Sequence, residues 1–463
     1  MNGAAAIAVA GLLLASPAAA DPASRAELEA VVRRVLAHED VLSRLWPGFW
    51  PPGQPFIIHH PDTGAVFAGL ASPAGPRFQP GPLPGAYSGY ELDYPSGAPD
   101  TVALKYGEEV ADLSTLFHEQ FHDYQRDAFR WIGGGHEEFV DVSLIPDRAG
   151  FAAAAEIERR VLVDAITARR AAQRRRFARE YLALREHRLG ALPPEVAAAE
   201  AHREWTEGTA EYVGLQGAAV LAKRPDRVRS RIVEGLRHDL NDARGGFSIN
   251  WFRWRAYSVG AGLAWRLDDL GADWRGAAEQ GARLDVLLSE ALGEGGADED
   301  AAALLARRRF ASLRRDMAER LARAPSAPSS RDQFLASAPM RLAIHVAVPP
   351  ALIPEMEMSF QAKGMTPLPG DALALTDLGY LVIRVGETEL RISDRPVLTE
   401  MVGGDARQIV LLSTFEGLDG LIAAAGRTGE PAPLSLELDW IRLRASAATV
   451  ELADNEIRLH LAP

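Results

Sequence analysis

The sequence of 463 residues contains no cysteine. A disulfide framework, a thiolate metal site and a cysteine nucleophile are therefore excluded, and any metal ion must be held by histidine and carboxylate side chains. A chain without thiols also suits an extracytoplasmic environment, where stray oxidation is a hazard. Histidine is scarce too, with 11 residues, so two histidines at the spacing of a metal-binding motif are informative.

Long apolar runs and an excess of basic residues are also missing. The one extended apolar stretch, residues 4–15, is too short to span a bilayer comfortably, and no later stretch reaches that length. The formal net charge of −13 argues against nucleic acid as a partner, because phosphate binding requires clustered cations. With 47% hydrophobic and 24% charged residues, the composition is typical of a globular chain and not of a disordered one.

The apolar run at the start of the chain is followed by Ser16-Pro17 and by the small-residue pattern Ala18-x-Ala20. This order predicts a signal peptide over residues 1–20 that is cleaved after Ala20, although Met1-Asn2-Gly3 lacks the usual basic residue. The alternative is a buried first helix or a retained anchor. We therefore expect an exported protein, periplasmic or secreted, with no transmembrane span after cleavage.

The rest of the chain divides into three parts by its hydrophobic pattern. Helical periodicity dominates residues 21–292, with two short strand patterns near residues 55–69. A Gly- and Asp-rich stretch opens a helical linker over residues 293–339. From residue 340 to 463, short runs alternate between polar and apolar residues, which predicts an antiparallel sheet or sandwich. The predicted fold class is therefore α+β, with a mostly helical domain, a small N-terminal sheet and a second, antiparallel β domain.

The motif His118-Glu119-x-x-His122 lies inside a helical pattern from Glu109 to Trp131. Residues four apart lie on one face of a helix, so His118 and His122 can direct two imidazoles at one Zn²⁺. Glu119 beside them can take a proton from a water molecule on the metal. The alternative interpretation is an amphipathic helix with two polar residues on its outer face.

A catalytic zinc ion needs a third protein ligand. Two segments offer one: His136–Glu138, just after the helix, and a later helical pattern that contains Glu207 and Glu211. The pair His59-His60 is a poorer candidate, because neighbouring residues of a strand point to opposite faces of the sheet.

The segment Trp205-Thr206-Glu207-Gly208, followed by Tyr212, is close to a Trp-x-x-Glu-Gly-x-x-x-Tyr pattern. On this motif and the His-Glu-x-x-His motif, the chain resembles the gluzincin metallopeptidases, in particular the zinc aminopeptidase and thermolysin-like catalytic domain. The resemblance covers about residues 100–270. It implies a zincin-like fold and a Zn²⁺ cofactor whose third ligand, beside the two histidines, is Glu207.

Two further roles follow from the resemblance and the helical spacing. Glu211 lies one turn after Glu207, and we expect it to accept the free N–H of a zinc-bound imidazole. The segment Tyr257-x-x-Gly260 resembles a helix start of the same peptidases, whose tyrosine donates a hydrogen bond to the oxyanion, so Tyr257 is the expected donor. Two features depart from the family: the interval of 85 residues from His122 to Glu207 is longer, and the Gly-x-Met-Glu-Asn segment of the aminopeptidases is absent.

The resulting hypothesis is an exported zinc metallopeptidase that hydrolyses peptide or protein substrates, with Glu119 and Tyr257 as its catalytic residues. The alternative is a secreted or envelope-associated binding protein, in which the zinc site is structural or decayed and the β domain engages a partner. An intact Glu119 favours the enzyme, because a structural site does not need it.

Overall fold

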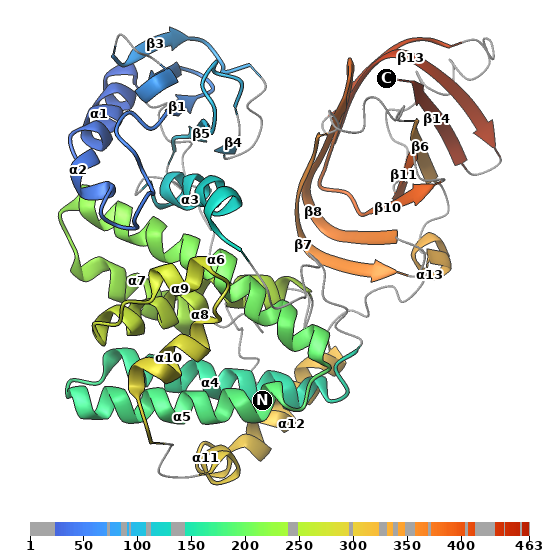
Figure 1. Cartoon of the computed structure of the whole chain (residues 1–463). Coiled ribbons are helices and arrows are strands. Elements are labelled where there is room, and N and C mark those ends of the chain that lie inside the picture. Colours follow the sequence, from blue (N-terminus) through green and yellow to red (C-terminus); the bar gives the residue numbers. More distant parts are fainter. Residues whose placement is uncertain are drawn as a thin grey trace, which may run out of the picture. The chain divides into compact units, whose positions relative to one another are not determined.

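The computed structural model describes residues 24–71, 75–84, 90–91, 94–107, 113–130, 144–238, 249–295, 300–323, 331–336, 341–347, 357–368, 372–402, 406–412, 431–438, 440–453 and 456–462. The predicted signal peptide therefore lies outside the described residues. The chain forms two compact units, one of Met1–Arg130 with Thr209–Arg231 and one of Trp131–Gly208 with Ile232–Pro463. Helices and sheets are both present (Figure 1), which confirms the α+β class. The zincin-like identity and the predicted domain boundaries stay predictions.

The first unit contains a five-stranded sheet in the order β3-β2-β1-β5-β4. Its strands are β1 (Phe56–His60), β2 (Gly64–Ala68), β3 (Arg77–Pro80), β4 (Tyr90–Glu91) and β5 (Val102–Lys105), and the helices before them are α1 (Arg25–Leu36) and α2 (Glu39–Leu42), with a 3₁₀ turn at Gly69–Ala71. β1 and β2 form the predicted antiparallel hairpin, and β1 pairs in parallel with β5.

The helix α3 (Ser114–Ala128) is the predicted zinc helix, and its start lies after a stretch outside the described residues. Aromatic side chains hold it in place. The Trp50 ring lies 5.0 Å from the Phe117 ring, and the Trp46 ring lies 5.0 Å from the Phe121 ring, centroid to centroid. Polar residues of α3 are buried as well as apolar ones, so this helix is central to its unit and is not a surface helix with a polar outer face.

Helices dominate residues 144–336. They are α4 (Arg148–Thr167), α5 (Ala171–Leu189), α6 (Pro194–Ala222), α7 (Asp226–Arg237), α8 (Ile249–Asp269), α9 (Arg275–Glu279), α10 (Leu284–Leu292), α11 (Ala301–Arg307), α12 (Phe310–Arg323) and α13 (Arg331–Ala336). The pattern from Ala149 to Leu189 predicts a single helix, and this is wrong: α4 and α5 are separate and lie side by side (Figure 1). The guanidinium of Arg174 donates to the carbonyls of Ala168 and Arg169, which stabilises the break between them.

A buried ion-pair network joins four helices of the second unit. Its members are Arg185 and Arg188 of α5, Arg255 of α8, Glu158 of α4, and Glu200 and Glu204 of α6. Burial alone would raise the pKa of the Glu200 carboxyl, but the guanidinium groups of Arg188 and Arg255 hold that pKa well below its usual range. Buried charges are tolerated only when they are paired, so the network fixes the N-terminal half of α6 against its neighbours.

The C-terminal sheet has nine strands, several of which the alternating pattern predicted. They are β6 (Arg341–Ala347), β7 (Glu357–Leu368), β8 (Ala372–Val385), β9 (Thr388–Ser393), β10 (Val397–Val402), β11 (Ala406–Leu412), β12 (Ala432–Leu438), β13 (Ile441–Ala453) and β14 (Glu456–Ala462). The hairpin predicted across Gly386-Glu387 is present. The strand pairs of the C-terminal sheet are antiparallel except one. β14 pairs in parallel with β6, so the prediction of a wholly antiparallel sheet is wrong at that pair. The long chain between β6 and β14 provides the crossover that a parallel pair requires.

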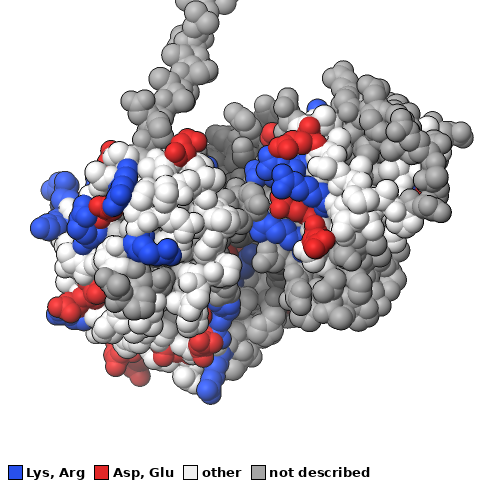
Figure 2. Space-filling view, turned by 90° about the horizontal axis from the view of Figure 1, so that it is seen from above, with Lys and Arg blue, Asp and Glu red and all other residues white. Residues whose placement is uncertain are grey.

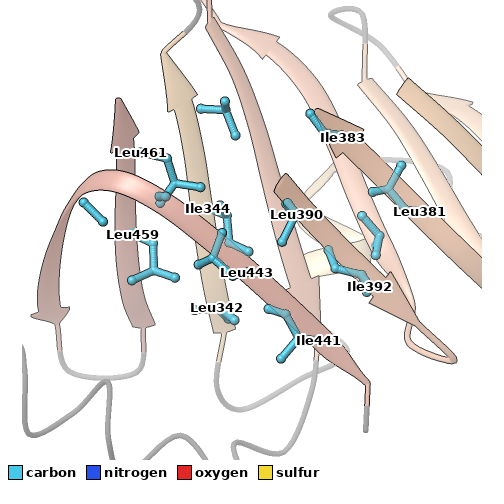
Figure 3. Packing of buried hydrophobic residues seen from close by; sticks show 14 of the residues in the cluster. Leu342, Ile344, Leu381, Ile383, Leu390, Ile392, Ile441, Leu443, Leu459 and Leu461 are labelled. Carbon is cyan, nitrogen blue, oxygen red and sulfur yellow. The ribbon is translucent and has the colours of Figure 1, made fainter. Parts of the chain in front are cut away.

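This sheet closes on itself. One edge of β8 pairs with β10 at residues 372–375 and with β9 at residues 380–385, and the path β10-β11-β6-β14-β13-β9 returns to β8. Between β9 and β10 the backbone of Asp394 has φ 56°, which marks the bend. Inside, apolar side chains from β6, β8, β9, β13 and β14 point toward one another (Figure 3).

Charged residues of both signs lie close together on the surface shown in Figure 2, where groups of Lys and Arg border groups of Asp and Glu among the described residues. Apart from this view, Arg174 of α5 pairs with Asp269, and Arg176 of the same helix pairs with the buried Glu180. None of the helices in the described part of the chain combines the length and the apolar character that a membrane crossing requires.

Candidate metal centre

The two histidines of the motif lie one turn apart on α3 and face each other. Their Nε2 atoms are 3.0 Å apart, and their ring centroids are 4.7 Å apart with an interplanar angle of 78°. The His118 and Glu119 side chains are only 5% and 7% exposed. Burial of polar groups costs free energy unless they have partners, so these side chains need partners inside the unit.

Glu207 is the carboxylate that the structure brings to this pair. One potential ligand atom from each of His118, His122 and Glu207 lies within 4.8 Å of the other two, and no other such group of three is found among the described residues. The helix predicted to contain Glu207 is α6, as expected. The other predicted source, His136–Glu138, lies outside the described residues.

Two glycines of α6 let that helix approach α3 closely. A Cβ atom added at Gly214 would lie 2.7 Å from the Ser114 carbonyl oxygen, and one added at Gly217 would lie 2.4 Å from the Phe117 ring. Real Cβ atoms do not tolerate such distances, so larger residues would force the helices apart. The approach explains how the chain between His122 and Glu207 can be long while their side chains meet.

Glu211 contacts the outer nitrogen of His118, as the helical spacing led us to expect. Its Oε2 atom is 3.4 Å from His118 Nδ1, at the long end of hydrogen-bond distance. A carboxylate at this position favours a proton on Nδ1 and leaves the Nε2 lone pair directed at the metal position.

Gln125 contacts the outer nitrogen of His122, a contact that we did not predict. Its Oε1 atom is 2.7 Å from His122 Nδ1, and its Nε2 atom donates to Thr209 Oγ1 at 2.8 Å. The sequence signal for this contact is a glutamine three residues after the second histidine of the motif, since residues three apart on a helix are neighbours.

These contacts test whether a metal ion suits the site. When both imidazoles are neutral and both Nδ1 atoms carry protons for their acceptors, the two Nε2 lone pairs face each other at 3.0 Å. This arrangement is repulsive unless a cation lies between them. Two imidazole nitrogens and one carboxylate oxygen are the donor set of a catalytic zinc site, so the residues present fit Zn²⁺.

Tyr257 lies in the interior of α8 (Ile249–Asp269), so the expectation that its segment begins a helix is wrong. Three residues after it, at Gly260, α8 crosses α6 closely. A Cβ atom added at Gly208 of α6 would lie 2.4 Å from the Gly260 Cα atom. The Tyr257 ring packs against the Trp254 ring, with centroids 5.6 Å apart. The glycine of the Glu-Gly pair and the glycine of the Tyr-x-x-Gly segment thus contact each other, while the role of Tyr257 toward an oxyanion stays a prediction.

The pair His59-His60 does not belong to the metal group. His59 is buried, both of its ring nitrogens lack a hydrogen-bond partner, and burial lowers its pKa to about 4. The His60 side chain projects to the other face of the strand, and its Nδ1 atom accepts a hydrogen bond from the backbone N–H of Asp62 at 3.3 Å.

Comparisons of the chain with protein-family models, with curated proteins and with solved structures found no match, so the functional proposal rests on the site itself.

Proposed function

We propose that this protein is a zinc-dependent hydrolase that cleaves peptide bonds, with His118, His122 and Glu207 as metal ligands. The observation that supports this most directly is that one potential ligand atom from each of these three residues lies within 4.8 Å of the other two, although Glu207 is 85 residues after His122 in the sequence. A zinc ion at this position would polarise a substrate carbonyl and lower the pKa of a water molecule.

Glu119 is the proposed general base. It follows His118 directly on α3, and it is buried. As base, Glu119 takes a proton from the attacking water, and it then gives that proton to the amine nitrogen as the C–N bond breaks. Tyr257 is the proposed donor to the carbonyl oxygen as negative charge develops on it.

Export remains part of this proposal. It rests on the apolar run and the Ala18-x-Ala20 pattern at the start of the chain, and on the absence of cysteine. A metallopeptidase outside the cytoplasm would act on peptide or protein substrates there.

The decisive experiment compares the wild-type protein with a Glu119→Gln variant purified in the same way. Metal content is measured by mass spectrometry, and hydrolysis is measured on a library of quenched fluorescent peptides. We expect both proteins to bind one zinc ion, and the variant to lose about 10²- to 10⁴-fold in activity, the usual contribution of a general base. Equal activity in the two preparations would exclude the proposed mechanism, and zinc binding without any hydrolysis in the wild type would favour a structural site.

A further inference from the structure

The two imidazoles of the metal group have different partners on their outer nitrogens. His118 faces the carboxylate of Glu211, whereas His122 faces the neutral amide of Gln125. We propose that Gln125 is a positioning residue that holds His122 in the tautomer required for metal binding, and that Thr209 holds Gln125 in the orientation required for this. The inference rests on the proposed metal site.

The tautomer of His122 decides whether it can bind a metal ion. A neutral imidazole has one N–H and one nitrogen lone pair, and Nε2 can be a ligand only when the proton is on Nδ1. The Gln125 Oε1 atom, 2.7 Å from Nδ1, can only accept a hydrogen bond, so it stabilises the proton there. If the amide were turned around, its NH₂ group would face Nδ1 and would favour a proton on Nε2.

Thr209 contacts the other end of the Gln125 amide. Its hydroxyl lies 2.8 Å from Gln125 Nε2 and accepts a hydrogen bond from it, which directs Oε1 toward His122. Gln125 is 6% exposed and Thr209 is fully buried, so water cannot readily replace either partner.

Thr209 also connects the contact between Gln125 and His122 to the third ligand. It lies on α6, two residues after Glu207, so the helix that provides the ligand carboxylate also orients the amide behind His122. Thus α6 supplies three polar contacts to this site: Glu207, Glu211 and Thr209.

The test is the zinc affinity of the full chain, measured by competition with a chromogenic chelator. The variants are Gln125→Met, which removes the acceptor, Gln125→Glu, which keeps an acceptor, and Thr209→Val. Gln120→Met is the matched control, because Gln120 is a buried glutamine of the same helix whose amide donates to the Asp100 carbonyl at 2.9 Å.

We expect Gln125→Met to weaken zinc binding by about 10- to 100-fold, the usual effect of removing a partner behind a metal ligand. Thr209→Val should weaken it by a smaller factor, and should add nothing in the double variant because it acts through Gln125. Gln125→Glu and Gln120→Met should match the wild type. The inference is overturned if Gln125→Met binds zinc as tightly as the wild type, or if Gln120→Met loses as much.

A second measurement separates positioning from a general loss of structure. In the metal-free protein labelled with ¹⁵N-histidine, long-range ¹H–¹⁵N correlation spectra distinguish the two tautomers. We expect a proton on Nδ1 of His122 in the wild type and a shift toward Nε2 in Gln125→Met, whereas an Nε2–H tautomer in the wild type would overturn the inference. A wild-type protein that binds no zinc would overturn the proposed function as well, whereas zinc binding that is insensitive to Gln125 would overturn this inference alone.

Discussion

Gly208 and Gly260 pack backbone against backbone, because a Cβ atom on Gly260 would lie 2.6 Å from the Gly208 Cα atom and 2.2 Å from the Glu204 carbonyl oxygen. Neither contact is with a flexible side chain that can move away. At the crossing of α6 and α8, only glycine therefore fits at positions 208 and 260. Gly208 follows Glu207 directly in the sequence.

Replacing Gly208 by alanine should force α6 and α8 apart. We expect a loss of about 1–3 kcal/mol in the free energy of unfolding, the usual cost of overpacking, together with weaker zinc binding because Glu207 moves. Denaturant unfolding and chelator competition measure the two effects. Gly276→Ala in α9 is the control: nothing lies within 4 Å of its added Cβ, so it should be neutral or stabilising by about 0.5–1 kcal/mol.

Removing the third ligand, Glu207, should weaken zinc binding more than removing Glu211, which contacts the outer nitrogen of a ligand. We expect Glu211→Gln to weaken zinc binding by about 10-fold and Glu207→Ala by more than about 100-fold, beyond the range of an outer partner. Affinities come from chelator competition, with thermal unfolding of the metal-free variants as the control for folding. A Glu207→Ala variant with wild-type affinity would mean that the third ligand is elsewhere, for example in His136–Glu138.

His59 should make the stability depend on pH between 6.5 and 4. Its pKa is lowered from 6.5 to about 4 in the folded protein, first by burial and then by the charges of Lys105 and His60. The unfolded chain therefore binds more protons in this range, and the free energy of unfolding should fall by about 3 kcal/mol as the pH is lowered from 6.5 to 4.

A His59→Leu variant provides the comparison. It has no titrating group at this position, so its free energy of unfolding should change less over the same pH range. At pH 7 it should be at least as stable as the wild type, because the buried ring nitrogens of His59 have no hydrogen-bond partner to lose. Equal pH dependence in the two proteins, measured by urea unfolding, would show that His59 is not the responsible group.

Arg255 should be among the residues whose loss destabilises the second unit most. It pairs with Glu158, Glu200 and Glu204, and all four side chains are buried. Arg255→Met removes one of the three cations of the network and leaves its three buried carboxylates with Arg185 and Arg188 alone, and we expect a loss of about 3–5 kcal/mol in denaturant unfolding. Arg442→Met breaks the exposed pair with Glu437 and should change the stability by less than about 1 kcal/mol.

The sequence predicted the local elements of the site because their signals are local. The spacing of His118 and His122 and the helix that contains Glu207 follow from a period of 3.6 residues. The hairpin of β1 and β2 follows from two short strand patterns on either side of the turn Asp62-Thr63-Gly64. The packing of these elements against one another was harder to predict. Nothing in the sequence pattern identifies Gly208, Gly214 and Gly217 as the contact points that bring α6 against its neighbours.

Other features had no signal of their own in the sequence. The break between α4 and α5 contains neither glycine nor proline, and it depends on Arg174 contacts that only the folded chain shows. The parallel pairing of β14 with β6 joins segments more than 100 residues apart, and alternation within a strand does not identify its partner. The contact of Gln125 with His122 has only a weak sequence signal, because a glutamine three residues after a histidine is common on helices and does not by itself indicate a metal site.

The closure of the C-terminal sheet has a consequence for the behaviour of the chain in concentrated solution. A row of unpaired backbone N–H and C=O groups is a template on which a second molecule can add a strand. Among the described strands of this sheet, the pairing of β8 with both β9 and β10 leaves only β7 and β12 with an outer side that has no neighbour over its whole length. Within this sheet, self-association through strand addition, if it is induced by heating or truncation, should therefore begin at those two strands.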